Sequence, residues 1–166
     1  MESIIIKGGK PLKGTINISG SKNASLPILA SSILVKKLQL TNIPYLADIN
    51  SMLNLLHSLG VNYKFIDKST KNTILLESKA KISSVADYDL VRKMRASFLI
   101  LGPLLTRYGK AEVSLPGGCA IGTRPVDLHI EGLKMMGANI TIKDGYVRAK
   151  VIGKLKGLKL NLKKFR

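Results

Sequence analysis

The fold is decided by a segment that occurs twice: Asn23-Ala24-Ser25-Leu26-Pro27-Ile28-Leu29-Ala30 aligns with Arg95-Ala96-Ser97-Phe98-Leu99-Ile100-Leu101-Gly102. The two copies lie 72 residues apart (95 − 23), and a second pair follows in the same order, with 56–62 matching 133–139 at an offset of 77 (133 − 56). Ordered matches at nearly equal offsets predict two copies of one βαβαββ unit. Chance similarity between apolar helices is the alternative for either match taken alone.

The spacing of apolar residues predicts the elements of these units. Helical spacing occurs at about 26–34, 48–59, 90–108 and 125–136. Runs of β-branched residues predict strands at 62–66, 73–76, 111–115, 139–142 and 146–151. For the first helix we expect a cap at Ser25 with Pro27 in the first turn, and for the third a kink at Gly102-Pro103. Residues 4–6 and 15–18 predict an N-terminal hairpin.

Length, charge and hydrophobic content limit the classes of protein to which this chain can belong. A chain of 166 residues with 45% hydrophobic residues has the size of one domain with a packed core. Its formal net charge of +17 suggests an anionic partner, but the lysines are scattered and only the tail after Asp144 is densely basic. The longest apolar stretches are too short to span a bilayer and no signal peptide is evident, so we expect a soluble, cytoplasmic protein that binds no membrane.

Two of the three chemically rich motifs lie near the starts of predicted helices. Ser19-Gly20-Ser21-Lys22-Asn23 precedes the first helix but lacks the spacing of a nucleotide-binding phosphate loop. Backbone amides at a helix start together with a lysine ammonium still form an anion site. A plain Gly-Ser turn with a solvated lysine is the alternative. The second motif, Arg92-Lys93-Met94-Arg95, lies within the third predicted helix.

The third motif surrounds the single cysteine, Cys119, in a loop from Pro116 to Asp127. One cysteine excludes an internal disulfide framework and fits a reducing compartment. A lone cysteine is usually a small buried hydrophobe, but glycines around Cys119 leave little bulk to bury it, and Arg124 supplies a nearby cation. We therefore interpret Cys119 as a reactive thiol. His57 and His129 lack a spaced partner ligand, so we propose no metal and no cofactor.

These motifs carry a resemblance to a known family. The segments Gly8-Gly9 with 11–14, 19–24, 94–97 with 101–104, and 115–129 closely resemble the N-terminal part of the enolpyruvyl transferases that act on UDP-N-acetylglucosamine in peptidoglycan synthesis. The resemblance fades only after about Gly157. It implies an α+β fold, an enolpyruvyl-transferase-type α/β prism built from βαβαββ repeats. Here the prism is incomplete, with about two repeats and an N-terminal hairpin.

The resemblance also implies a reaction and roles for residues. The 3-hydroxyl of UDP-N-acetylglucosamine attacks C2 of phosphoenolpyruvate, C3 is protonated, and phosphate leaves. Cys119 would deliver the proton to C3. Lys22 and Arg124 would hold phosphoenolpyruvate, and Asn23 and Arg95 would help bind the substrates. Arg124, Pro125, Val126, Asp127 and Leu128 would form part of the uridine-nucleotide site.

Members of this family are more than twice as long as this chain. By resemblance, residues 1–20 are strands that complete a second domain, 21–166 form an incomplete first catalytic domain, and the second domain with the sugar-deprotonating base is absent. We expect a fragment or half-enzyme whose partner is a separately encoded C-terminal half. A non-catalytic remnant that binds UDP-sugar or a partner chain remains open. A small basic nucleic-acid-binding protein is the alternative from another class, but aromatic residues make up only 5% and would leave the motifs unexplained.

Overall fold

The computed structural model describes residues 3–67, 69, 71–86, 88–91, 94–115, 126–159 and 161, which form two similar units. The first unit contains α1 (Lys22–Ser31), the 3-10 helix η1 (Ser32–Leu34), β1 (Lys37–Leu40), α2 (Ala47–Leu59), β2 (Val61–Phe65) and β3 (Ile74–Ser78). The second contains β4 (Val85–Ala86), α3 (Tyr88–Val91), the 3-10 helix η2 (Arg95–Ile100), α4 (Leu101–Tyr108), β5 (Lys110–Ser114), α5 (Asp127–Met135), β6 (Ala138–Lys143) and β7 (Tyr146–Val151).

The two sheets confirm the predicted repeat. The first has the order β1-β3-β2 and the second β4-β5-β7-β6. All neighbours are antiparallel except β4 and β5, which are parallel. Strands β1, β3 and β2 therefore correspond to β5, β7 and β6. Only the second unit has a strand before its first helix among the described residues, so the first βαβαββ unit lacks its opening strand there.

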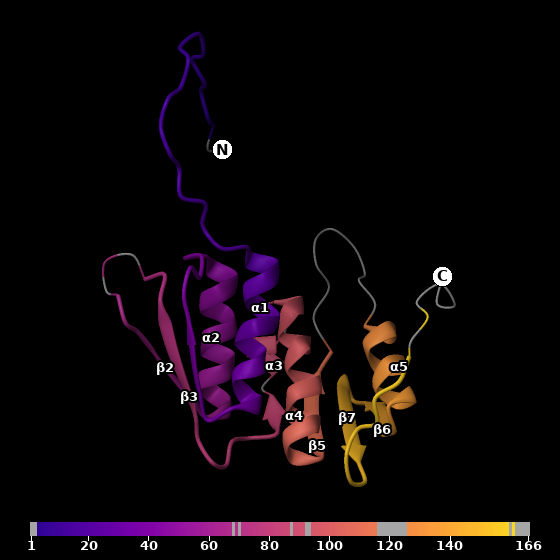
Figure 1. Ribbon diagram of the computed structural model, residues 1–166. Coiled ribbons are helices and arrows are strands. Elements are labelled where there is room, and N and C mark those ends of the chain that lie inside the picture. Colours follow the sequence, from indigo (N-terminus) through magenta and orange to yellow (C-terminus); the bar gives the residue numbers. More distant parts are fainter. Residues whose placement is uncertain are drawn as a thin grey trace.

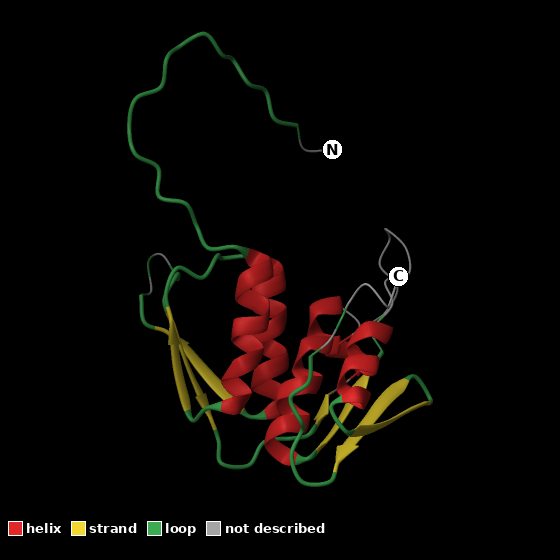
Figure 2. Ribbon diagram, turned by 45° about the vertical axis from the view of Figure 1, so that its right-hand side comes forward, coloured by secondary structure: helices red, strands yellow, loops and turns green. Residues whose placement is uncertain are grey.

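The helices lie between the two sheets and form the core (Figure 2). Their inward faces are apolar at helical spacing, and the side chains at the centre are fully buried: Leu29, Ile33, Met52, Leu56, Leu101 and Leu104. The burial of these apolar side chains is the main favourable contribution to folding. No helix of the described ranges is long and apolar enough to cross a membrane.

The first helix begins earlier than predicted. Ser21, and not Ser25, caps α1, since its side chain accepts a hydrogen bond from the amide of Ala24 at 3.4 Å. Ser25 is buried within the helix, and its hydroxyl donates to the carbonyl of Ser21 at 2.8 Å. Pro27 consequently lies beyond the first turn, and the predicted site residues Lys22 and Asn23 form the helix start.

The third predicted helix is not continuous. It divides into α3, η2 and α4, and the change from the 3-10 helix η2 to the α-helix α4 falls at Leu101, directly before Gly102-Pro103. Pro103 is the third residue of α4 and lies in its first turn, where a proline is tolerated. The residues predicted to face the core, including Met94, Phe98 and Leu105, are buried as expected.

The predicted N-terminal hairpin is also wrong. Residues 3–19, which we call the N-terminal arm, contain no strand and project away from the start of α1 (Figure 1). Its apolar side chains are exposed, with Ile5 at 92%, Leu12 at 94% and Ile16 at 81% of their maximum. A hairpin without a third strand or a helix to cover it is marginally stable in water, and no described element lies against the arm.

Candidate substrate site at the helix starts

The helices share one direction, which brings their starts together. In Figure 1, α1, α2 and α5 and the segment η2–α4 all begin at the upper end of the molecule. The first amides of a helix point outward without partners and carry partial positive charge. The predicted residues Lys22, Asn23, Arg95, Asp127 and Leu128 all lie in the first turns of these helices.

Lys22 opens α1 and pairs with a carboxylate of α2. Its Nζ lies 2.7 Å from Oδ2 of Asp48, and the two side chains are 46% and 40% exposed. An ammonium has three N–H donors, so this ion pair fixes the position of Lys22 and leaves donors for an incoming anion. Sequence reasoning missed Asp48 as a partner. The available signal was an acidic residue in the first turn of a predicted helix.

Asn23 is exposed as the second residue of α1. Pro27, four residues later, has no N–H, so the carbonyl of Asn23 lacks the donor that a regular helix supplies. The start of α1 therefore presents a carbonyl acceptor as well as an ammonium.

A close contact at Gly20 fixes the chain just before α1. The amide of Gly20 donates to Oδ1 of Asn42 at 3.1 Å, and Nδ2 of Asn42 donates to the carbonyl of Ile18 at 3.5 Å. A Cβ added at Gly20 would lie 1.9 Å from the backbone oxygen of Asn42. Only glycine permits this approach, and it sets the position of Ser21 and Lys22.

Arg95 opens η2, which packs against α1, so the structure brings it to the same side of the core as Lys22 and Asn23. Arg95 is exposed, whereas Ser97, two residues later, is 1% exposed. The repeat explains this pairing, because Asn23 and Ser25 occupy the equivalent positions in the first unit.

The start of α5 is joined to η2 by an aromatic contact. The rings of Phe98 and His129 meet edge to face with centroids 6.0 Å apart. Val126 is buried at 8% exposure, Asp127 is exposed, and Leu128 is 48% exposed. Among the predicted nucleotide-site residues, the buried Val126 therefore anchors the helix start while its two neighbours face solvent.

Cys119, Arg124 and Pro125 lie outside the described residues, so their roles stay predictions. No group of three or more His, Cys, Asp and Glu side chains within the described part of the chain could hold a metal ion.

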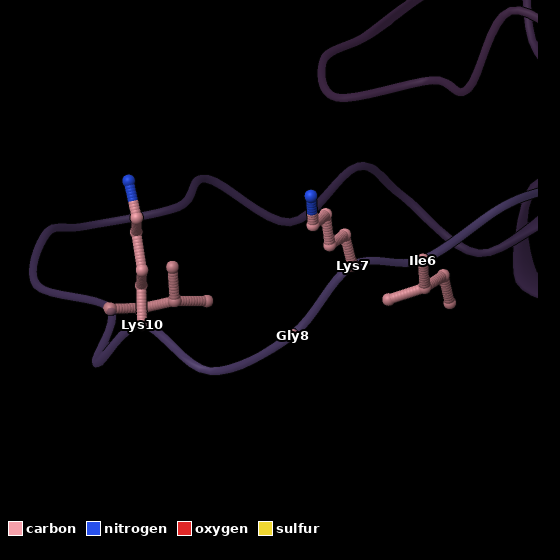
Figure 3. Close-up of a pocket in the computed structure, with 5 residues that line it drawn as sticks. Ile6, Lys7, Gly8 and Lys10 are labelled. Atoms are coloured by element: carbon pink, nitrogen blue, oxygen red, sulfur yellow. The ribbon is translucent and has the colours of Figure 1, made fainter.

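The N-terminal arm contains a hollow that is separate from the candidate site at the helix starts. It is lined by Ile6, Lys7, Gly8, Lys10 and Leu12, where the arm bends upon itself (Figure 3). No predicted site residue lines it, so it is not part of the candidate site.

Comparisons with known proteins show what this chain is similar to. The family model for EPSP synthase (3-phosphoshikimate 1-carboxyvinyltransferase) matches residues 6–165. The UDP-N-acetylglucosamine 1-carboxyvinyltransferases of Rickettsia bellii and Rickettsia africae are each 57% identical to this chain over 157 residues. Each match covers 95% of this chain and 38% of the relative, so the chain spans well under half the length of these proteins.

Solved structures show the same fold at low sequence identity. The enolpyruvyl transferase NikO from Streptomyces tendae matches with a TM-score of 0.70 and 20% identity, over 90% of this chain and 32% of that one. An EPSP synthase from Acinetobacter baumannii matches with a TM-score of 0.62 and 20% identity, over 91% and 35%. The fold class predicted from the sequence is confirmed.

Proposed function

Because this chain belongs to the enolpyruvyl transferase family that the EPSP synthase model describes, we propose that it is the N-terminal portion of a UDP-N-acetylglucosamine 1-carboxyvinyltransferase. The observation that carries the proposal is the 57% identity to relatives of that name over 95% of the chain. The grouping of Lys22, Asn23 and Arg95 at adjoining helix starts supports it.

The proposed reaction moves an enolpyruvyl group to the 3-hydroxyl of the sugar. The hydroxyl oxygen bonds to C2 of phosphoenolpyruvate, and its proton passes to a base. The thiol of Cys119 delivers a proton to C3. The C2–O bond to phosphate then breaks while C3 gives a proton back to a base of the site, which restores the C2=C3 double bond of the enolpyruvyl group. Positioned proton donation of this kind accelerates reactions by about 10² to 10⁴.

In this proposal, residues at or near the helix starts bind the anionic substrates. We assign Lys22 and Arg124 to the phosphoenolpyruvate anion, and Asn23 and Arg95 to both substrates. Arg124, Pro125, Val126, Asp127 and Leu128 are assigned to the uridine nucleotide. The Lys22–Asp48 pair at 2.7 Å supports the first assignment, because it holds the ammonium in place before substrate arrives.

A second polypeptide portion completes the enzyme in this proposal. The relatives extend well beyond the matched 38% of their length. None of the acids Asp48, Asp87, Asp89 and Asp127 matches the family's base for the sugar hydroxyl. We assign that base and the second domain to a C-terminal portion, with residues 1–20 belonging to the second domain and 21–166 to the first. A remnant that only binds UDP-sugar or a partner chain is the alternative.

Binding calorimetry tests the site. Replacing Lys22 by alanine removes a charge-assisted contact, so we expect the affinity for phosphoenolpyruvate or UDP-N-acetylglucosamine to fall by roughly 10- to 200-fold. Lys159→Ala is the matched control, because Lys159 is an exposed lysine of the C-terminal tail and should change affinity little. Equal losses in both variants would mean that net charge alone governs binding.

Alkylation tests the assigned acid. By its family, this cysteine should react with the epoxide antibiotic fosfomycin, and the chain has one cysteine, so the adduct is unambiguous by mass. We expect Cys119 to be labelled faster than free cysteine, and Cys119→Ser to show no adduct. Labelling no faster than free cysteine would contradict an activated thiol.

A further inference from the structure

Strand β2 is an open edge of the first sheet. Among the residues that the structure describes, it pairs with β3 alone, and the two strands lie at the left margin of the molecule in Figure 1. The register with β3 runs without interruption from Val61 opposite Ser78 to Phe65 opposite Ile74, so no bulge bends this edge. The strand also contains no proline. An edge without these protections is a template for a further strand.

The hydrogen bonds to β3 show which backbone groups of β2 point outward. Ile66, directly after β2, donates its amide to the carbonyl of Thr73 at 2.9 Å, so it faces β3. Directions alternate along an antiparallel strand, so every second residue of β2 faces β3 as Ile66 does. The amides and carbonyls of the other three residues therefore point away from the sheet: Val61, Tyr63 and Phe65.

The inner side of this edge carries aromatic rings that are incompletely covered. Tyr63 and Phe65 are half-buried, and their rings meet edge to face with centroids 6.1 Å apart. The counterpart of Tyr63 in the second unit is Ile140, the third residue of β6, which is only 8% exposed. At this position β2 therefore retains exposed apolar surface that β6 does not.

We propose that the β2 edges of two copies of this chain pair across a two-fold axis and form a dimer. A two-fold axis makes the paired strands antiparallel and uses the same residues on both sides. In a pairing centred on Tyr63, the Tyr63 residues of the two copies exchange backbone hydrogen bonds, and Phe65 lies opposite Val61 of the second copy. The half-buried rings of the two copies then cover one another.

Charge and length select this register over its neighbours. On the outer face it places Lys64 opposite Asn62 of the second copy, whereas a register centred on Lys64 would place two lysines opposite each other. A register centred on Asn62 would place Phe65 opposite Leu59, which belongs to α2. The pairing centred on Tyr63 uses all of β2 and keeps like charges apart.

The same register brings opposite charges together across the two copies. Glu77 of β3 lies directly opposite Asn62, and its carboxylate pairs with Lys37 at 3.5 Å. Neighbouring strands are about 4.8 Å apart, so the long side chain of Lys64 from the second copy can extend over the short Asn62 side chain toward Glu77. Each Glu77 then has a cation on either side.

The N-terminal arm is the segment of this chain that competes for the edge. Its end is held beside Asn42, which follows β1, because the amide of Gly20 donates to Oδ1 of Asn42. Strand β1 lies on the opposite side of the sheet from β2. A second copy reaches the β2 edge without crossing the sheet, so it fits better.

Asn62→Lys tests the register. In the dimer the new ammonium would lie opposite Lys64 of the second copy at two symmetric positions, so we expect the dissociation constant of the dimer to rise by about 2- to 30-fold. Within one chain the same ammonium lies opposite Glu77, so the melting temperature should not fall. Sedimentation velocity over a range of protein concentrations measures the dissociation constant.

Two further variants complete this test. Gln39→Lys is the matched control, because it adds the same charge on the exposed face of β1, opposite Leu75 and away from the β2 edge. Asn62→Glu reverses both effects: the carboxylate faces Lys64 of the second copy and tightens the dimer, but it lies opposite Glu77 and lowers the melting temperature. Equal dissociation constants for Asn62→Lys and Gln39→Lys would overturn the proposal.

Amide hydrogen exchange gives an independent readout. The amide of Tyr63 points outward, so its exchange should slow as the protein concentration and the dimer fraction rise. The amide of Lys64 faces β3 and is the internal control, since it should exchange slowly at every concentration. A chain that sediments as a monomer at all concentrations overturns the proposal, and so does a dimer in which Tyr63 stays unprotected. Protection of Tyr63 that is independent of concentration and lost on removing residues 3–18 assigns the edge to the arm instead.

Discussion

Adding a single methyl group at Gly20 should have a large effect on the stability of the fold. A methyl group there would meet the backbone oxygen of Asn42 at 1.9 Å, which cannot rotate away as a flexible side chain would. Gly20→Ala should therefore lower the free energy of unfolding by about 1–3 kcal/mol and weaken the hydrogen bond to Asn42. Urea unfolding measures the loss.

Gly102→Ala is the matched control for that experiment. Gly102 lies in the first turn of α4, and a Cβ there would meet nothing within 4 Å. Alanine favours helix over glycine, so stability should rise by up to about 1 kcal/mol. A loss at Gly102 as large as at Gly20 would contradict the close contact as the cause.

At the same scale, local sequence singled out Lys22, Asn23 and Arg95 as candidates but did not predict their surroundings. Lysine before an apolar helix is a local signal, whereas its pairing with Asp48 depends on how α1 packs against α2. Asn42 likewise contacts Gly20 only because the chain returns there after β1. Contacts between segments that lie far apart in the sequence cannot be predicted from either segment alone.

Among the elements, α4 packs against the first unit and is also joined to it by the hydrogen bonds of Arg107. The guanidinium of Arg107 donates to the carbonyl of Ile33, to the hydroxyl of Ser78, and to the carbonyl of Lys79 at 3.1 Å. Arg107→Ala should lower the free energy of unfolding by about 1.5–3 kcal/mol, since hydrogen bonds from charged groups are the stronger ones. Thermal or urea unfolding measures it.

Arg148→Ala is the comparison for Arg107. Arg148 pairs with Glu112 at 3.1 Å on the surface of the second sheet, where both side chains are partly exposed. Such pairs contribute less than about 1 kcal/mol. If both variants lose the same stability, Arg107 does not join the two units.

Elements with strong local signals were predicted well. Gly60 ends α2 with a φ of 111°, and Asp144 and Gly145 form the β6–β7 turn with φ of 53° and 77°, as their residue types favour. The third helix was predicted as continuous because its apolar spacing persists through Met94 and Phe98. Its division into α3, η2 and α4 reflects packing against α1 and α2, which periodicity does not contain.

For the whole molecule, the arm should be dispensable to the core. Lys10 and Lys13 are exposed in a segment without secondary structure, so brief trypsin treatment should cut there first. Lys64 is also exposed but lies in β2, so it should resist cleavage. We expect the melting temperature to change by less than about 2 °C after arm removal. A large fall would show that the arm packs on the core in solution.

The isolated chain should turn over negligibly. Electrostatic catalysis depends on a closed, water-excluded site, and we assign the base to the C-terminal portion of the enzyme. A phosphate-release assay with both substrates should detect no reaction from this chain. It should detect the reaction from a full-length chimera that carries this chain in place of the matching portion of the Rickettsia bellii relative. Release at an enzyme-like rate, lost in Cys119→Ala, would show that these 166 residues hold a complete site.

The shared direction of the helices makes the folded chain a permanent electric dipole. Helices α1, α2, α4 and α5 have 10, 13, 8 and 9 residues, and at about 3.5 debye per peptide unit their moments add to the order of 100 debye. On a negatively charged chip or resin the molecule should orient with the helix starts against the surface. Immobilisation on such a support would hide Lys22 and Arg95 from ligand, whereas a neutral support would leave them accessible.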